Sequence, residues 1–146
     1  MSLTLEQIEA RRAELRAANE RAQDEQLTTD MARVLELEEE HGYDAVEVIR
    51  LARYRPGATA LVVAEVPRAS DHRFKRYRQV AGSEKSNSAA KTDAADLFAK
   101  SCMLYPSPKD QAELYEVTVD AAPGILGHVA LQLVKAVQGR ELEEGK

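Results

Sequence analysis

The sequence predicts an α+β fold that is mainly α-helical, with a long N-terminal helical arm, one β-hairpin and a C-terminal bundle of three to four helices. Three observations support this prediction. The first 40 residues are rich in Glu, Ala and Arg, two β-branched runs flank an Arg-Pro-Gly-Ala turn, and proline breaks separate amphipathic segments further on. A chain of 146 residues fits one ordinary domain. We expect the arm in residues 1–41 and a small α+β domain in residues 42–146.

The N-terminal arm is expected to begin at a capping box. Thr4 is followed three residues later by Gln7, the spacing that satisfies two free N–H groups at a helix start. The Thr-Thr-Asp run at residues 28–30 leaves two alternatives open, one long helix or two helices in series with the second capped there. Gly42 is expected to end this helical region, because glycine readily adopts the positive φ that closes a helix.

A narrow apolar stripe runs along the arm. Ile8, Leu15 and Ala22 recur at seven-residue spacing among Glu and Arg residues. The stripe is too poor in Leu and Ile for a strong coiled coil. It indicates either a helix that packs on its own domain or an exposed helix that binds a partner. We therefore take Ile8 and Leu15 as candidate partner-binding residues.

Residues 46–66 are predicted to form a β-hairpin. Residues 46–54 and 59–66 are rich in Val and partly alternating, which is typical of strands. Between them, Pro56 and Gly57 occupy the second and third positions of a turn, as a type II turn requires. A lone hairpin is only marginally stable, so it must pack against helices or pair with another chain.

Four helices are predicted after the hairpin, at about residues 70–81, 88–103, 107–119 and 123–138. In the second of them, the three- and four-residue spacing typical of a buried face is shared by Ala94, Leu97, Phe98, Ser101 and Cys102. Ser70-Asp71 and Ser107 are suitable N-terminal caps, and Pro108 suits a first helical position. The last segment has the clearest amphipathic pattern in the chain and is expected to close at Gly139, with a solvated tail beyond it.

Charge is segregated along the chain. Residues 1–50 carry 6 Lys or Arg and 13 Asp or Glu, whereas residues 66–100 carry 8 and 4. Solvated faces explain such runs most simply. The alternative is that the acidic arm and the basic middle attract each other, between copies or with another protein. The basic helix interleaves cations with aromatic residues, a pattern that also occurs in nucleic-acid-binding proteins, although the short cluster and acidic chain disfavour nucleic acid. Its candidate partner-binding residues are Phe74, Lys75, Arg76, Tyr77 and Arg78.

The sequence offers no recognisable catalytic, cofactor or metal motif. The three histidines are far apart without metal-ligand neighbours, and no phosphate-binding glycine loop or nucleophile motif is present. Cys102 is the single cysteine and lies in an apolar run, which indicates a buried structural thiol. No apolar run approaches the ~20 residues of a membrane helix, and no signal peptide is recognisable. We expect a non-enzymatic protein of the cytoplasm with no catalytic residues, cofactor, metal or membrane partner.

Three features of the C-terminal half occur together in a fixed order. They are the aromatic-basic segment at residues 74–78, the SCMLYPS sequence at residues 101–107, and an apolar helix that follows Pro123-Gly124 and reaches Gly139. In these features the chain resembles the tail assembly chaperones of long-tailed bacteriophages. The match covers roughly residues 68–139. The long acidic arm departs from the shorter members of the family.

The resemblance implies holding-type chaperoning in the host cytoplasm. Such proteins bind the tape-measure protein, an elongated helical chain, during tail assembly and require no cofactor. Two alternative functions stay open for this chain: a structural virion component such as a decoration or connector subunit, which would remain in the particle, and, less favoured, a small nucleic-acid-binding protein. Association between copies of the chain is compatible with each of them. A frameshifted longer product is also compatible with the sequence.

Overall fold

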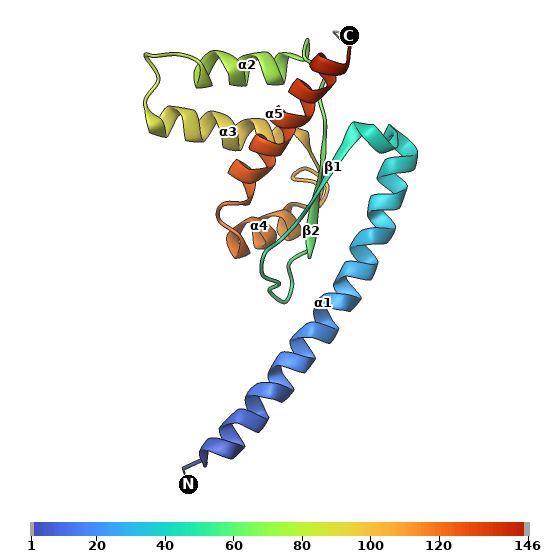
Figure 1. Cartoon of the computed structure of the whole chain (residues 1–146), viewed down its shortest axis with the longest axis vertical. Coiled ribbons are helices and arrows are strands. Elements are labelled where there is room, and N and C mark those ends of the chain that lie inside the picture. The colour runs from blue at the N-terminus through green and yellow to red at the C-terminus, as the bar shows by residue number, and fades with distance from the viewer. Residues whose placement is uncertain (1, 145–146) are drawn as a thin grey trace.

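The computed structural model describes residues 2–144, and the side chains of residues 2–139. It confirms an α+β fold that is mainly helical, in which a three-stranded antiparallel sheet has α1 on one face and the remaining long helices on the other (Figure 1). The sheet order is β1-β2-β3. The elements are α1 (Leu5–His41), a 3-10 turn η1 (Tyr43–Ala45), β1 (Val46–Arg50), β2 (Leu61–Glu65), α2 (His72–Ala81), α3 (Ser88–Cys102), β3 (Met103–Tyr105), α4 (Ala112–Ala121) and α5 (Ile125–Glu144).

Helix α1 is continuous over 37 residues, so the alternative of two helices in series is wrong. The hydroxyl groups of Thr28 and Thr29 donate to the carbonyl groups four residues earlier instead of capping a new helix. The predicted capping box is confirmed, because the Thr4 N–H donates to Gln7 Oε1 at 2.9 Å and the Gln7 N–H donates to Thr4 Oγ1 at 3.1 Å. At the other end, Gly42 has the expected positive φ, 100°.

The region predicted as an arm divides into two parts. Residues 2–21 are all exposed, and Figure 1 shows this part of α1 extending away from the sheet. Nearer the C-terminal end of α1, Asp30, Val34 and Leu37 are buried against the sheet. The packed half therefore belongs to the domain. We use "arm" below for the part of α1 that precedes it, residues 5–25, in which only residues 22 and 23 are partly buried.

The predicted turn of the hairpin is confirmed. Gly57 has φ of 88°, close to the value that a type II turn needs at its third position, and the Ala58 N–H donates to the Arg55 carbonyl at 3.0 Å. The strands are shorter than predicted and are joined by a longer connection. The sequence did not predict β3, which adds an antiparallel strand beside β2. The expected helix over residues 88–103 ends at Cys102 so that Met103 begins this strand.

The two faces of the sheet support two apolar clusters. Leu61 and Val63 of β2 point toward α1, whereas Val62 and Ala64 point toward the other helices, as alternation along a strand requires. The larger cluster unites these strands with α2, α3 and α5. Five buried residues of α5 belong to it, Ile125, Val129, Ala130, Leu133 and Val137. The apolar face predicted for the last helix is thus confirmed.

Two helix boundaries differ from the prediction. The Ser107 hydroxyl accepts from the Asp110 N–H at 3.1 Å, but this closes an isolated turn, and α4 begins only at Ala112. Helix α5 continues through Gly139 to Glu144, where the sequence was expected to form a tail. Glycine inside a helix costs only ~1 kcal/mol, and the Glu and Leu residues that follow are good helix formers. Residues 145 and 146 of the predicted tail lie outside the described residues.

Candidate functional site

Helices α2 and α3 lie side by side on the face of the sheet opposite α1 (Figure 1). Local chemistry fixes the start of each helix. The Asp71 carboxylate accepts from the Arg73 N–H at 2.8 Å, and the Asn87 side chain accepts from the Ala90 N–H at 2.8 Å. The rings of Phe74 and Phe98 then meet beneath the two helices with centroids 6.0 Å apart and are both buried.

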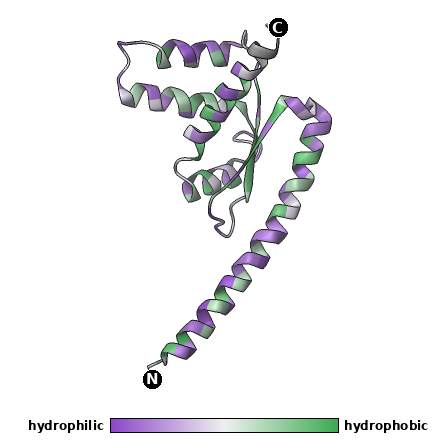
Figure 2. Cartoon of the chain, in the orientation of Figure 1, coloured by the Kyte–Doolittle hydropathy of each residue, from purple (hydrophilic) through white to green (hydrophobic). Residues whose placement is uncertain are grey.

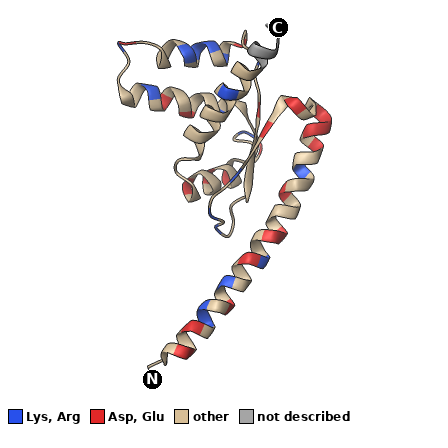
Figure 3. Ribbon diagram, in the orientation of Figure 1, with Lys and Arg blue, Asp and Glu red and all other residues tan. Residues whose placement is uncertain are grey.

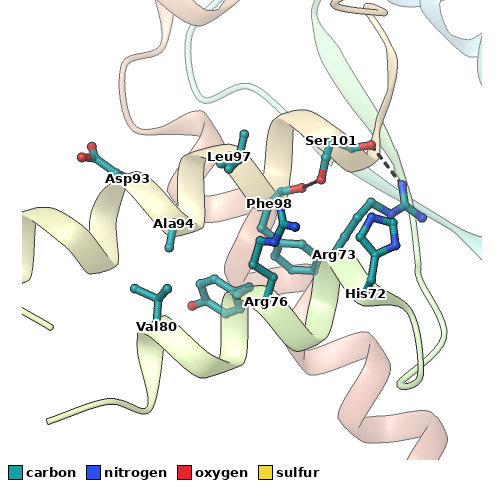
Figure 4. A pocket seen from close by; sticks show the side chains of 10 residues that line it. His72, Arg73, Arg76, Val80, Asp93, Ala94, Leu97, Phe98 and Ser101 are labelled. Carbon is teal, nitrogen blue, oxygen red and sulfur yellow. Dashed lines mark hydrogen bonds between the residues drawn. The ribbon is translucent and has the colours of Figure 1, made fainter. Parts of the chain in front are cut away.

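A groove of about 450 Å³ opens between these two helices. Tyr77 and Phe98 stack within it, with ring centroids 5.1 Å apart and planes 14° from parallel. Figure 4 shows Val80 and Ala94 facing one another across the groove. The full lining is His72, Arg73, Arg76, Tyr77 and Val80 of α2 with Asp93, Ala94, Leu97, Phe98 and Ser101 of α3. The interior is therefore mainly apolar, and the charged groups come from residues at its edges.

One end of the groove is fixed by Arg73. Its guanidinium donates to both carboxylate oxygens of Asp71 at 3.1 and 2.9 Å and to the Ser101 carbonyl at 3.0 Å, and it lies 3.7 Å from Glu65 Oε2 (Figure 4 draws the bond to Ser101). The hydrogen bond from Arg73 lowers the pKa of the Asp71 carboxyl, and the same bond raises the pKa of Arg73. Arg73 therefore links α2, α3 and β2 and has little capacity left for a partner.

Arg76 is the cation of this groove that remains available. It is exposed on α2, one turn beyond Arg73, and has no ion-pair partner among residues 2–139. Figure 3 shows that Lys and Arg gather on α2, whereas Asp and Glu are spread along α1 and dominate its C-terminal turns. An anionic side chain of a partner would find Arg76 beside an apolar surface.

The structure brings only part of the predicted partner-binding set together. Arg76 and Tyr77 line the groove, as described above. Lys75 and Arg78 are exposed elsewhere on α2, and the Arg78 guanidinium lies 5.6 Å from the centroid of the Phe74 ring. Phe74 itself is 1% exposed in the core. It is therefore a packing residue, which corrects its assignment as a partner contact.

The other two predicted residues, Ile8 and Leu15, lie on the arm on the opposite side of the sheet. They are 40% and 71% exposed, and Leu5, which precedes them, is also exposed. Figure 2 shows hydrophobic residues interspersed among hydrophilic ones along this part of α1. The stripe on the arm and the groove between α2 and α3 are therefore separate apolar surfaces.

Leu97 is the groove residue that the sequence placed wrongly. Its spacing with Ala94 and Phe98 predicted a buried helix face, but Leu97 is 59% exposed while Phe98, Ala99 and Cys102 form the buried face. Apolar residues cover a wide part of the α3 surface, so periodicity alone could not tell which edge stays open. The sequence does contain one indication of an exposed apolar edge, because α3 has more apolar positions than a single buried face needs.

A second cluster of polar side chains lies deep between α1 and the sheet. Asp30 is fully buried, and its carboxylate accepts from Gln26 Nε2 at 2.8 Å, from the Tyr105 hydroxyl at 2.6 Å and from the Ala60 N–H at 2.7 Å. Burial, and then the bond to Asp30, raise the pKa of the Tyr105 hydroxyl. Because these hydrogen bonds join α1 to β3 and to the residue before β2, the cluster fastens the packed half of α1 to the sheet.

A reactive cysteine and a metal centre are two further kinds of site to consider within residues 2–139. Cys102 is buried, as predicted, and burial raises the pKa of its thiol to about 11, so little thiolate forms near neutral pH. Among the described residues, no group of three His, Cys, Asp or Glu side chains is placed to hold a metal ion. In the same part of the chain, no single helix has the length and hydropathy to cross a membrane, and α4 and α5 meet that test only as a pair bent by 96°.

Comparison of the chain with protein-family models, with curated proteins and with solved structures gives no match. The resemblance to tail assembly chaperones therefore stays a prediction from the sequence.

Proposed function

We propose that this chain is a non-enzymatic phage tail assembly chaperone that binds an amphipathic helix of the tape-measure protein in the groove between α2 and α3. The groove is the observation that carries the proposal. Its volume of about 450 Å³ is within the range of ligand pockets. It lies between two neighbouring helices, α2 and α3, and amphipathic helices of partner proteins bind in apolar grooves of this kind. The proposed site of action is the host cytoplasm.

The chemistry of the groove suits reversible holding of a helix. Leu97 and the half-buried ring of Tyr77 offer an apolar surface to the partner's apolar side chains, and the buried Phe98 stacks against Tyr77 from the core. Arg76 offers a charge to an acidic neighbour. The charge of Arg76 fixes the position of the bound helix, whereas the small apolar contact buries little area and so limits the binding free energy. Tail-tube subunits can therefore displace the chaperone.

Co-expression with the tape-measure protein of the same phage tests the proposal. The wild-type chain is expected to raise the soluble fraction of that protein, and Arg76→Glu and Leu97→Ser are expected to remove most of the effect. Lys75→Glu makes the same charge change on α2 outside the groove, and Leu131→Ser removes a similarly exposed leucine from α5. The proposal fails if the wild-type chain does not solubilise the tape-measure protein. It also fails if the groove variants match their controls.

The projecting arm favours one second candidate, a structural subunit that stays in the particle. An exposed helix with an apolar stripe is a means of attachment to a neighbouring subunit. Mass spectrometry of purified particles separates the two functions. A chaperone is absent from the finished particle, whereas a decoration or connector subunit is present in stoichiometric amounts.

A further inference from the structure

We propose that the free edge of β1 pairs with the β1 edge of a second copy, so that two copies form one continuous antiparallel sheet. In the sheet formed within residues 2–144, the strand order is β1-β2-β3, and β1 is therefore an outer strand. The β1 edge is a different surface from the groove between α2 and α3, and the inference does not depend on the proposed function.

The backbone of β1 has hydrogen-bonding groups on this edge. In an antiparallel pair, every second residue exchanges bonds with the neighbouring strand, and the residues between them point their N–H and C=O groups away. The Leu51 N–H donates to the Ala60 carbonyl at 3.0 Å. The Val66 N–H donates to the Ala45 carbonyl at 2.8 Å, so the bonds to β2 come from odd-numbered residues of the first strand. The even-numbered residues of β1 point toward the open edge, and they are Val46, Val48 and Arg50.

The centre of this edge is also open to solvent. Val48, the middle residue of β1, is 37% exposed, whereas each of residues 61–64 in the neighbouring β2 is at most 1% exposed. An apolar side chain at the centre of an unpaired edge is typical of a place where another strand is added.

Two copies of β1 fit together in one antiparallel register. With Val48 on the two-fold axis, Val48 lies opposite its equivalent, and Val46 lies opposite Arg50 in both directions. Each of these pairs can exchange two hydrogen bonds through the outward-pointing groups. Glu47 lies opposite Ile49, so no like charges are directly opposite one another.

The two ends of β1 carry opposite charges. The acidic end, residues 34–47, contains six Asp or Glu and no Lys or Arg, whereas the basic end, residues 48–64, contains three Arg and no Asp or Glu. In the antiparallel register, the basic end of each copy runs along the acidic end of the other. A parallel pairing would place like charges together. The edge is therefore complementary to itself, which identifies a second copy as its occupant.

The charged groups at both ends suit this arrangement. At the acidic end, three Glu side chains at residues 38–40 occupy the last turn of α1 (Figure 3), where the helix dipole favours cations over carboxylates. At the basic end, none of the arginines forms an ion pair within residues 2–139, and they are Arg50, Arg53 and Arg55. The arginines of one copy are therefore available to the carboxylates of the other.

Sedimentation velocity of the full chain over a range of concentrations tests the inference. Wild type is expected to show a monomer–dimer equilibrium without larger species, because a symmetric contact closes on itself. Val48→Pro removes an outward-pointing N–H and no bond to β2, so it is expected to give a monomer with the circular dichroism of wild type. Leu131→Ser, which changes an exposed apolar residue of α5, is the control and should dimerise like wild type. A wild-type chain that stays monomeric at all concentrations overturns the inference, as does a folded Val48→Pro chain that dimerises like wild type.

Charge exchange gives a test that does not depend on the folding of the proline variant. One chain has Glu38, Glu39 and Glu40 replaced by Arg, and a second chain carries Arg50→Glu and Arg53→Glu. Each alone is expected to dimerise about tenfold more weakly than wild type, because like charges then meet at both ends. An equimolar mixture is expected to form a heterodimer in which every end meets its opposite. A mixture that associates no better than its components would contradict the assigned register.

Cysteine pairing identifies the contact directly. Residues paired through two hydrogen bonds have Cα atoms ~5.5 Å apart, within the range of a disulfide, so Val48→Cys alone is expected to give a disulfide-linked dimer under mild oxidation. Leu131→Cys has a similarly exposed thiol on α5 and is expected to stay monomeric, and Cys102 is buried in both chains. Equal dimer formation by the two variants would overturn the inference.

The proposed function has a separate readout. Arg76→Glu lies in the groove and is expected to leave dimerisation unchanged. If copies do not associate but Arg76→Glu still abolishes solubilisation of the tape-measure protein, this inference fails and the proposed function stands. If copies pair through β1 but wild type does not solubilise that protein, the proposed function fails and this inference stands.

Discussion

Replacing Asp30 by alanine is expected to be among the most damaging single changes in this protein. The carboxylate is fully buried and accepts from the Tyr105 hydroxyl at 2.6 Å and from the Ala60 N–H at 2.7 Å. Without it, both donors stay buried without an acceptor, and each such group costs ~1–3 kcal/mol. We therefore expect Asp30→Ala to lower the free energy of unfolding by about 4 kcal/mol, a large part of the stability of an ordinary domain.

Replacing Tyr105, the hydroxyl donor to Asp30, is expected to lower the free energy of unfolding by a smaller amount. Tyr105→Phe removes one hydrogen bond to a charged acceptor while Asp30 keeps its other donors, so the expected loss is ~1.5–3 kcal/mol. In the double variant the two losses overlap, because the Tyr105 hydroxyl is no longer present to be left without an acceptor. The sum of the single losses should therefore exceed the double loss by about 1–2 kcal/mol.

Urea unfolding followed by circular dichroism measures these free energies. Thr29→Ala, which changes an exposed residue one position before Asp30, is the control and is expected to stay within ~0.5 kcal/mol of wild type. A loss below ~1 kcal/mol for Asp30→Ala would refute the reasoning, because it would mean that the buried donors find other acceptors. Strict additivity of the two variants would refute the assigned contact between them.

Three further predictions concern single groups. The raised pKa of Tyr105 favours its protonated form in the folded state. The stability that this hydroxyl contributes is therefore complete below its ordinary pKa near 10 and is lost as the pH rises above that value. Urea unfolding at a series of pH values should show wild type losing stability above pH ~10 more steeply than Tyr105→Phe. Gly57→Ala should cost ~1–2 kcal/mol in the same assay because the φ of 88° is strained for any side chain, although Val117 at 3.8 Å leaves room for the added carbon. Cys102 should resist alkylation at pH 8 until the chain is unfolded by urea, and rapid labelling of the native protein would contradict its burial.

The features predicted correctly from sequence are those set by neighbours in the chain. The capping box at Thr4 and Gln7 and the turn at Pro56 and Gly57 each depend on residues within four positions, so the residue types were sufficient to locate them. The apolar face of α5 was predicted for the same reason, since one helix carries the whole pattern.

The features that sequence reasoning missed depend on residues far apart. The Thr-Thr-Asp run at residues 28–30 has the composition of a helix cap, but the Asp30 carboxylate bonds to Tyr105, 75 residues away, and the helix continues. A contact distant in sequence also concealed β3, which is a strand because β2 lies beside it and Val63 pairs with Tyr105. For the candidate site, the sequence identified Arg76 and Tyr77. Which side of each helix is covered depends on packing with distant residues. Phe74 was therefore predicted as a partner contact but is buried, and Leu97 was predicted as buried but is exposed.

The packed half of α1 also explains why the arm stays helical although it is exposed to solvent. A free helix has to nucleate, which is the unfavourable step, and short isolated helices are marginal in water. Here the turns held by Val34 and Leu37 provide a formed nucleus, and the Ala, Glu and Arg residues of the arm only extend it. Amide hydrogen exchange should therefore accelerate progressively from residue 30 toward residue 5. The sheet thus supports a helical segment about 30 Å long that it does not itself contact.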